Sequence, residues 1–121
     1  MRALILDDDA TYQVIIETLL SIQQEKIKYK QLLDPIEALE FLQSPEGVEF
    51  DSIFLDINMP QINGWEFLDE LQKLNIAKNI FILTSSADLQ DLERSRQYDN
   101  IKGYYIKPIS KEQLAIILCF K

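Results

Sequence analysis

The chain has 121 residues, of which 47% are hydrophobic and 26% charged, and this composition fits one globular domain over residues 1–121. With 20 acidic and 12 basic residues and no cluster of Lys or Arg, it is not expected to bind nucleic acid directly. It has no histidine and a single cysteine, Cys119, so an internal disulfide and histidine-based zinc or catalytic sites are excluded. A metal site must therefore be built from oxygen ligands.

No segment has the features of a membrane span or a secretory signal. Apolar runs such as Leu114–Phe120 are far too short to cross a bilayer, and the N-terminus lacks the basic start and long apolar segment of a signal peptide. We expect a cytoplasmic protein without a membrane partner.

The chain begins with a strand, an acidic turn and a helix. The apolar run Ala3–Leu6 stops at Asp7, Asp8 and Asp9, and Asp9 suits a helix N-cap. Adjacent carboxylates at the end of a buried strand repel each other unless a cation lies between them, so Asp7 and Asp8 indicate a divalent metal. The residues that then repeat at helical spacing are Val14, Ile15, Thr18, Leu19 and Ile22.

The next segment predicts a more exposed edge strand and a second helix. Ile27–Leu33 alternates apolar and polar residues, and Asp34-Pro35 supplies an N-cap followed by Pro at the first helical position. We expect this helix to end near Ser44-Pro45, and Glu46-Gly47 to lead into the third strand.

The segment Ser52–Gly64 carries one carboxylate out of a buried strand and onto a loop. Ile53–Leu55 is apolar throughout and predicts a strand covered on both faces, which places Asp56 at its C-terminal end. Met59-Pro60 and Asn63-Gly64 are typical of a loop. A helix is expected from about Trp65, with a buried stripe at Phe67, Leu68, Leu71 and Leu74.

The last third contains two further strands, each followed by a helix. Ile80–Leu83 ends at Thr84, and the helix from about Asp88 to Tyr98 has a thin apolar face, chiefly Leu89 and Leu92, and should be loosely held. Gly103–Ile106 ends at Lys107-Pro108, and a capping box at Ser110–Gln113 starts the final helix.

Five strands alternating with five helices predict a doubly wound α/β fold with a parallel sheet in the order 2-1-3-4-5. Strand ends in such a sheet meet at one edge, which gathers three carboxylates, a hydroxyl and an ammonium into one pocket: Asp7, Asp8, Asp56, Thr84 and Lys107. This set suits phosphoryl transfer to a carboxylate, assisted by Mg²⁺.

These residues also carry a family resemblance. Asp56, Met59, Pro60 and Gly64 reproduce the D-x-x-M-P-x-x-x-G phosphoacceptor segment of response-regulator receiver domains, and the chain looks most like the single-domain chemotaxis type. Asp7-Asp8, Thr84 and Lys107-Pro108 recur at matching distances, so the resemblance extends from about Ala3 to the end. It implies a flavodoxin-like fold and a signalling role in which the only reactions catalysed are the domain's own phosphorylation and dephosphorylation.

The resemblance also implies the roles of individual residues. Asp56 would accept a phosphoryl group from a histidine kinase or a histidine phosphotransfer protein, and Thr84 and Lys107 would contact phosphoryl oxygens. Mg²⁺, or alternatively Mn²⁺, would be held by Asp8, Asp56, the main-chain carbonyl of Asn58 and, partly through water, Asp7. Tyr104 would be the switch aromatic coupled to Thr84, and Lys107-Pro108 a cis bond. The responding face would comprise the helix near 88–98, the strand 103–106 and the final helix.

Two features leave alternatives open. The chain is one residue longer between Thr84 and Lys107 than common receivers, and Asn58 and Ser86, which tune phosphoryl lifetime in receivers, are small. At the C-terminus, Ile116, Cys119 and Phe120 should be partly exposed while Leu114, Ile117 and Leu118 are buried. Either a homodimer or effector surface, or a segment missing from this sequence, would explain that exposure.

Three other functions compete with a receiver. A haloacid-dehalogenase-type phosphatase needs a second Asp two residues after the nucleophile, where this chain has Asn58. A flavodoxin-like electron carrier needs a phosphate-binding loop after the first strand, where three aspartates would repel a flavin phosphate. An inert scaffold would not need the complete acidic set.

Overall fold

The computed structural model describes residues 1–120, which form a five-stranded sheet and six helices. The strands are β1 (Arg2–Leu6), β2 (Lys28–Leu32), β3 (Ser52–Leu55), β4 (Asn79–Thr84) and β5 (Ile101–Ile106). The helices are α1 (Ala10–Ser21), α2 (Pro35–Leu42), α3 (Pro45–Val48), α4 (Gly64–Lys73), α5 (Leu89–Ser95) and α6 (Lys111–Leu118). All neighbouring strands are parallel, and their order, β2-β1-β3-β4-β5, confirms the prediction.

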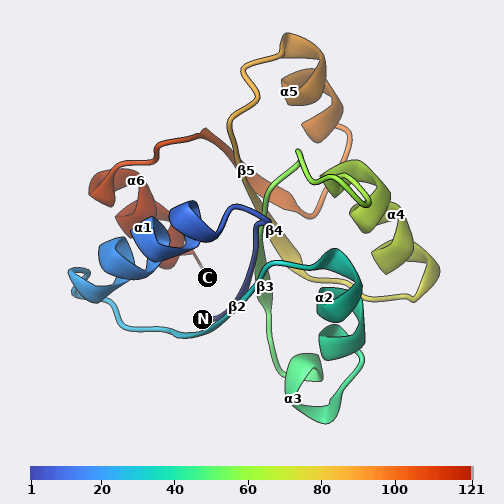
Figure 1. The fold of residues 1–121 in the computed structure, drawn as a ribbon, viewed down its shortest axis with the longest axis horizontal. Helices are drawn as coiled ribbons and strands as arrows, with labels where there is room; N and C mark the ends of the chain where they lie inside the picture. The colour runs from blue at the N-terminus through green and yellow to red at the C-terminus, as the bar shows by residue number, and fades with distance from the viewer. Residues whose placement is uncertain (121) are drawn as a thin grey trace.

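The helices cover both faces of the sheet. Figure 1 shows α1 and α6 side by side on one face, and α2 to α5 on the other. Successive strand residues point alternately to these two layers. Ile53 and Leu55 join the core beneath α2 and α4, whereas Phe54 and Phe81 join the core beneath α1 and α6. All four residues of β3 are buried, as expected for a strand covered on both faces.

The expected number of helices was wrong by one, because α3 is a separate single turn. Pro45 ends α2 but also suits the first position of a helix, and the Ser44 hydroxyl accepts a hydrogen bond from the N–H of Gly47 at 3.0 Å. The Ser-Pro-Glu-Gly sequence therefore stops one helix and starts another. Gly47 is required there, since a Cβ atom would lie 1.8 Å from the carbonyl oxygen of Phe41.

The repeat that predicted α1 does not lie on its buried face. Val14, Ile15 and Ile22 are 62%, 41% and 60% exposed. The buried residues of α1 are Tyr12, Gln13, Ile16 and Leu20. The position of Asp9 determines this rotation: its side chain accepts from the N–H of Tyr12 at 3.1 Å, so α1 starts where Tyr12 and Ile16 face the sheet. The polar Gln13 hid the true stripe.

The C-terminal helices agree with the sequence in most respects. Leu114, Ile117 and Leu118 are buried, while Ile116 is 65% exposed and Cys119 is exposed. Phe120 is half-buried and packs edge-on against Phe81. Helix α5 is shorter than expected, and its predicted contact residue Leu89 is 73% exposed. None of the helices within residues 1–120 has the length and apolar content that a membrane span requires.

Candidate functional site

The register of the sheet brings four strand ends to one edge. Leu6 pairs with Leu55, and Thr84 pairs with Ile106, so the residues that follow these strands lie next to one another. The N–H of Asp56 donates to the carbonyl of Leu6 at 3.1 Å, and the N–H of Lys107 donates to the carbonyl of Thr84 at 2.8 Å. The backbone hydrogen bonds of the sheet therefore fix the positions from which the predicted site side chains extend.

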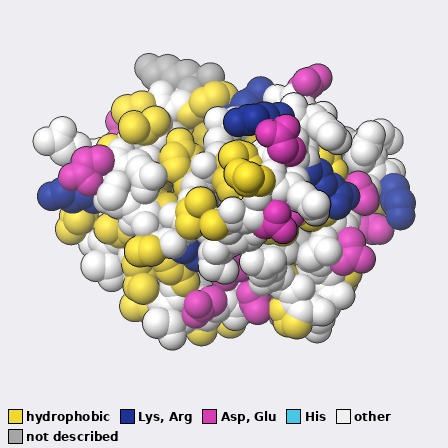
Figure 2. Space-filling view, turned by 90° about the horizontal axis from the view of Figure 1, so that it is seen from above, with side chains coloured by type: hydrophobic (Ala, Val, Ile, Leu, Met, Phe, Trp, Pro, Cys, Tyr) yellow, Lys and Arg dark blue, Asp and Glu magenta, His cyan; other side chains and the backbone are white. Residues whose placement is uncertain are grey.

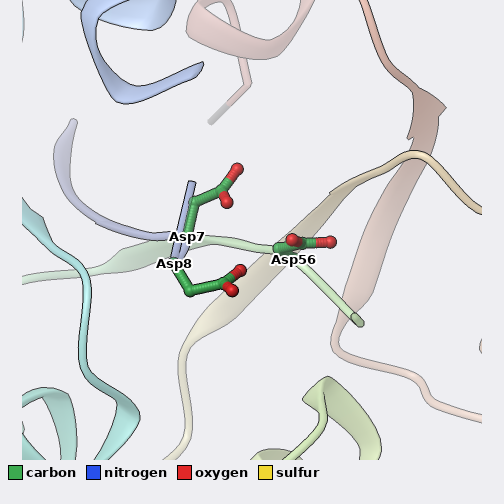
Figure 3. Close-up of side chains that lie close together, drawn as sticks. All are labelled: Asp7, Asp8 and Asp56. Atoms are coloured by element: carbon green, nitrogen blue, oxygen red, sulfur yellow. The ribbon is translucent and has the colours of Figure 1, made fainter. Parts of the chain in front are cut away.

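Three carboxylates gather at this edge. Figure 3 shows Asp7 and Asp8 leaving the end of β1 beside Asp56 at the end of β3, with all three carboxylates on the same side. A carboxylate oxygen from each lies within 4.8 Å of the others. Asp7 and Asp56 are buried and Asp8 is exposed. Asp9 is the N-cap of α1, as predicted, and does not belong to the cluster.

Lys107 contacts two of the three carboxylates. Its ammonium lies 2.5 Å from Asp7 Oδ2 and 3.4 Å from Asp56 Oδ2. Burial raises the pKa of Asp7 from 3.8 to about 6, although Lys107 and the N–H of Asp9 favour its charged form. Burial lowers the pKa of Lys107, but Asp7 and Asp56 outweigh this effect and its pKa is raised. Burial therefore determines the direction of the pKa shift at Asp7, whereas the neighbouring charges determine it at Lys107. The reason is that Lys107 faces two carboxylates, while Asp7 has one ammonium partner that it shares with Asp56.

Thr84 and Ser86 connect the cluster to β5. The Thr84 hydroxyl is fully buried and accepts the N–H of Ser86 at 3.2 Å, with the Asn58 amide at a long 3.5 Å. The Ser86 carbonyl accepts the hydroxyl of Tyr104 at 3.1 Å. The structure thus links Thr84 to the aromatic residue expected to move with it, through a single intervening residue.

Several supporting residues were not predicted. Asp91 on α5 accepts two hydrogen bonds, one from the Trp65 indole of α4 at 3.1 Å and one from the Ser86 hydroxyl at 2.6 Å. The Gln13 amide donates to carbonyls at the ends of β1 and β2, including that of Asp7 at 3.2 Å. Tyr12 lies under Lys107, with 4.5 Å between the ammonium and the ring centroid. Tyr12 could have been found from the spacing of Tyr12, Ile16 and Leu20, whereas Gln13 interrupts that apolar stripe and Asp91 carries no local signal.

The Lys107–Pro108 peptide bond is cis, which confirms the expectation drawn from the resemblance.

Comparison with known proteins decides the family. The model of the response regulator receiver domain matches residues 3–118. This chain belongs to that family. Receiver domains are phosphoacceptor modules of two-component signalling, and the family acts with histidine kinases and phosphotransfer proteins. The haloacid-dehalogenase and flavodoxin alternatives are thereby set aside.

Individual relatives match this chain at modest sequence identity. The chain is 28% identical over 116 residues to the sensor histidine kinase CheAY of Helicobacter pylori and 27% identical over 114 residues to the cell cycle response regulator CtrA of Brucella ovis. These matches include 95% and 94% of this chain. They span only 14% of the length of CheAY and 47% of the length of CtrA. A two-component response regulator from Cytophaga hutchinsonii superposes with a TM-score of 0.83 at 25% identity, covering 96% of this chain and 92% of that one.

The residues of the receiver pocket fit a divalent cation. Asp7, Asp8 and Asp56 offer hard oxygen donors on one side, which is the donor type that Mg²⁺ prefers. Asp8 is exposed, whereas Asp7 and Asp56 are buried, so water can reach the cluster at Asp8. The Asn58 carbonyl as a further ligand stays a prediction.

Proposed function

We propose that Asp56 is the phosphoacceptor of this receiver and that residues 1–121 act as one receiver domain. The observation that supports this most strongly is the buried Asp56 carboxylate, which lies within reach of two further carboxylates and of the Lys107 ammonium. The donor would be a histidine kinase or a histidine phosphotransfer protein. The cytoplasmic location expected from the sequence remains a prediction.

In the proposed reaction an oxygen of Asp56 attacks phosphorus, and the bond from phosphorus to the donor nitrogen breaks, leaving its electron pair on the donor. Asp8, Asp56 and, partly through water, Asp7 would hold Mg²⁺ or Mn²⁺, which when bound neutralises charge on the phosphoryl oxygens. Lys107 exchanges its contact with Asp56 for one with a phosphoryl oxygen, and Thr84 donates to another. The domain would thus catalyse its own phosphorylation, and with water as the acceptor its own dephosphorylation.

The exposed apolar face of α1 suits the approach of a donor. Val14 and Ile15 lie in the second turn of α1, whose first turn follows the Asp7–Asp9 segment directly. A protein donor must bring its phosphohistidine to the open side of Asp56, and exposed apolar side chains on the helix that directly follows Asp7–Asp9 would give it a surface to bind. The exposure of these residues then has a functional reason.

The responding surface would comprise α5, β5 and α6. Phosphorylation draws Thr84 toward the phosphoryl oxygen, which frees the N–H of Ser86 and lets Tyr104 fill the vacated space. A charge-assisted hydrogen bond of roughly 1.5–3 kcal/mol is large enough to shift two packings that differ by a few kcal/mol. Leu89, Ile106 and Ile116 are exposed on these elements, and the side of the molecule that carries α5 shows hydrophobic patches among charged side chains (Figure 2). A homodimer partner or an effector would bind here.

The test is to incubate the chain with Mg²⁺ and acetyl phosphate and to weigh it intact. The parent should gain the mass of one phosphoryl group, and Asp56→Asn should gain none while keeping its fold by circular dichroism. Asp69→Asn, which changes an exposed carboxylate on α4, is the matched control and should behave like the parent. A mass gain that persists in Asp56→Asn would show that another residue is the acceptor.

A further inference from the structure

Tyr12 makes two contacts with the segment that carries Lys107. The face of its ring lies under the Lys107 ammonium, 4.5 Å from the centroid. Its hydroxyl oxygen accepts the N–H of Ile109 at 3.0 Å, two residues beyond Lys107. Tyr12 is buried in the first turn of α1. Helix α1 therefore reaches across the strand ends to hold the exit of β5.

The ring is the one uncharged partner among the three groups that the described structure places around this ammonium. The other two are Asp7 and Asp56, both of which are needed elsewhere during the proposed reaction. Once a cation draws on these carboxylates, they hold Lys107 less firmly. An aromatic face attracts an ammonium through its quadrupole and uses none of its N–H donors.

A ring also suits a lysine that must change partners. A third carboxylate would fix the ammonium in one direction and compete for the metal, and an aliphatic side chain would offer no attraction. Burial raises the pKa of the Tyr12 phenol, so the ring stays neutral. Lys107 can then turn from Asp56 to a phosphoryl oxygen while it stays above the same ring.

We propose that Tyr12 is a positioning residue for phosphoryl transfer, because its ring holds the Lys107 ammonium over the pocket. This inference rests on the proposed function of Asp56. Tyr12 itself touches neither the phosphoryl group nor the metal in this scheme and acts only through Lys107.

The ring and the hydroxyl can be separated by substitution in the full chain. Tyr12→Phe keeps the ring, and Tyr12→Leu removes both groups. We expect the rate of phosphorylation by acetyl phosphate at saturating Mg²⁺ to stay within about twofold in Tyr12→Phe. In Tyr12→Leu it should fall by about 2- to 30-fold, the range of a cation–π contact, with the Mg²⁺ affinity unchanged.

One measurement and one control variant distinguish positioning from a purely structural role. The ε-methylene protons of Lys107 should show a ring-current shift in NMR spectra of the parent and Tyr12→Phe, and lose it in Tyr12→Leu. Ile16→Val, a buried substitution one turn along α1, controls for lost stability and should keep both the rate and the shift.

A third variant at position 12 has a ring like that of Tyr12→Phe, which also lacks the hydroxyl, and differs from it in the charge distribution over the ring. Pentafluorophenylalanine placed at position 12 no longer presents a negative face, so it should slow phosphorylation as Tyr12→Leu does. This variant also decides the matter if Tyr12→Leu does not fold. A parent rate in the fluorinated variant, or equal loss in Tyr12→Phe and Tyr12→Leu, would overturn the inference. A parent chain that takes up no phosphoryl group would instead overturn the proposed function.

Discussion

Replacing Asp7 by Asn should stabilise the metal-free protein at neutral pH. Asp7 is buried, and its pKa is raised from 3.8 to about 6 because burial outweighs the attraction of Lys107. At about 1.36 kcal/mol per pKa unit, this shift corresponds to about 3 kcal/mol of destabilisation by the charged carboxylate. The Asn side chain is neutral and of similar size, and Lys107 keeps Asp56 as a partner, so most of this free energy should be recovered.

The pH dependence has a definite sign. Because the pKa of Asp7 is higher in the folded than in the unfolded chain, the stability that comes from its proton is fully present below about pH 3.8. It is lost as the pH rises through about 6. Urea unfolding in EDTA at several pH values between 4 and 8 should therefore show parent and variant close together at pH 4. Asp7→Asn should be more stable by up to about 3 kcal/mol at pH 7 and above.

The metal should reverse the comparison. Mg²⁺ stabilises the state that binds it by mass action, so it should raise the melting temperature of the parent more than that of Asp7→Asn. Asp8→Asn is the matched control: Asp8 belongs to the same cluster but is exposed, so its metal-free gain should be smaller. A stability difference between parent and Asp7→Asn that does not change from pH 4 to pH 7, or a variant less stable at pH 7, would refute the reasoning.

Three further predictions concern the switch and the responding surface. Thr84→Ala should still accept phosphate, but NMR with beryllofluoride should show smaller shifts at Tyr104 and α5 than in the parent; equally large shifts would mean that Thr84 is not the coupling element. Asp91→Ala should lower the free energy of unfolding by about 1–3 kcal/mol, because it leaves the buried Trp65 N–H without its acceptor. Trp65, the single tryptophan, reports this by fluorescence, and Glu93→Ala on the exposed side of α5 should change little. If α5, β5 and α6 form a homodimer surface, light scattering should detect a dimer with beryllofluoride that Ile116→Ser weakens; a monomer at every concentration would exclude it.

The sheet and the strand-end residues could be predicted because their signals are local. A run such as Ile53–Leu55 is apolar on both faces only in a strand covered on both sides, and the polar residue after it marks the end of that strand. Parallel topology then brings the ends together without any further information. The set Asp7, Asp56, Thr84 and Lys107 follows from these two steps, which is why the structure gathers the predicted residues.

The local sequence pattern did not predict the structure where two signals overlapped, or where two residues in contact are far apart in the sequence. Ser44-Pro45 fits both the end of one helix and the start of the next, so α3 was missed. The Tyr12 hydroxyl and the Ile109 N–H are separated by 97 residues, and the Trp65–Asp91 contact by 26. Nothing near either residue in the sequence indicates its partner, because each contact joins two elements that meet only in the folded chain.

Gln13 explains why the buried face of α1 was predicted incorrectly. A polar residue between Tyr12 and Ile16 reads as an interruption of an apolar face, yet the ends of parallel strands present carbonyl groups that need donors. The two N–H groups of the Gln13 amide are shared among three of them, on Ile5, Asp7 and Leu32, and its oxygen accepts from Gln31. The residue thus satisfies the backbone at the point where β1 turns toward the carboxylate cluster. In a helix that follows a buried strand, a single amide on the apolar face is therefore evidence for that face rather than against it.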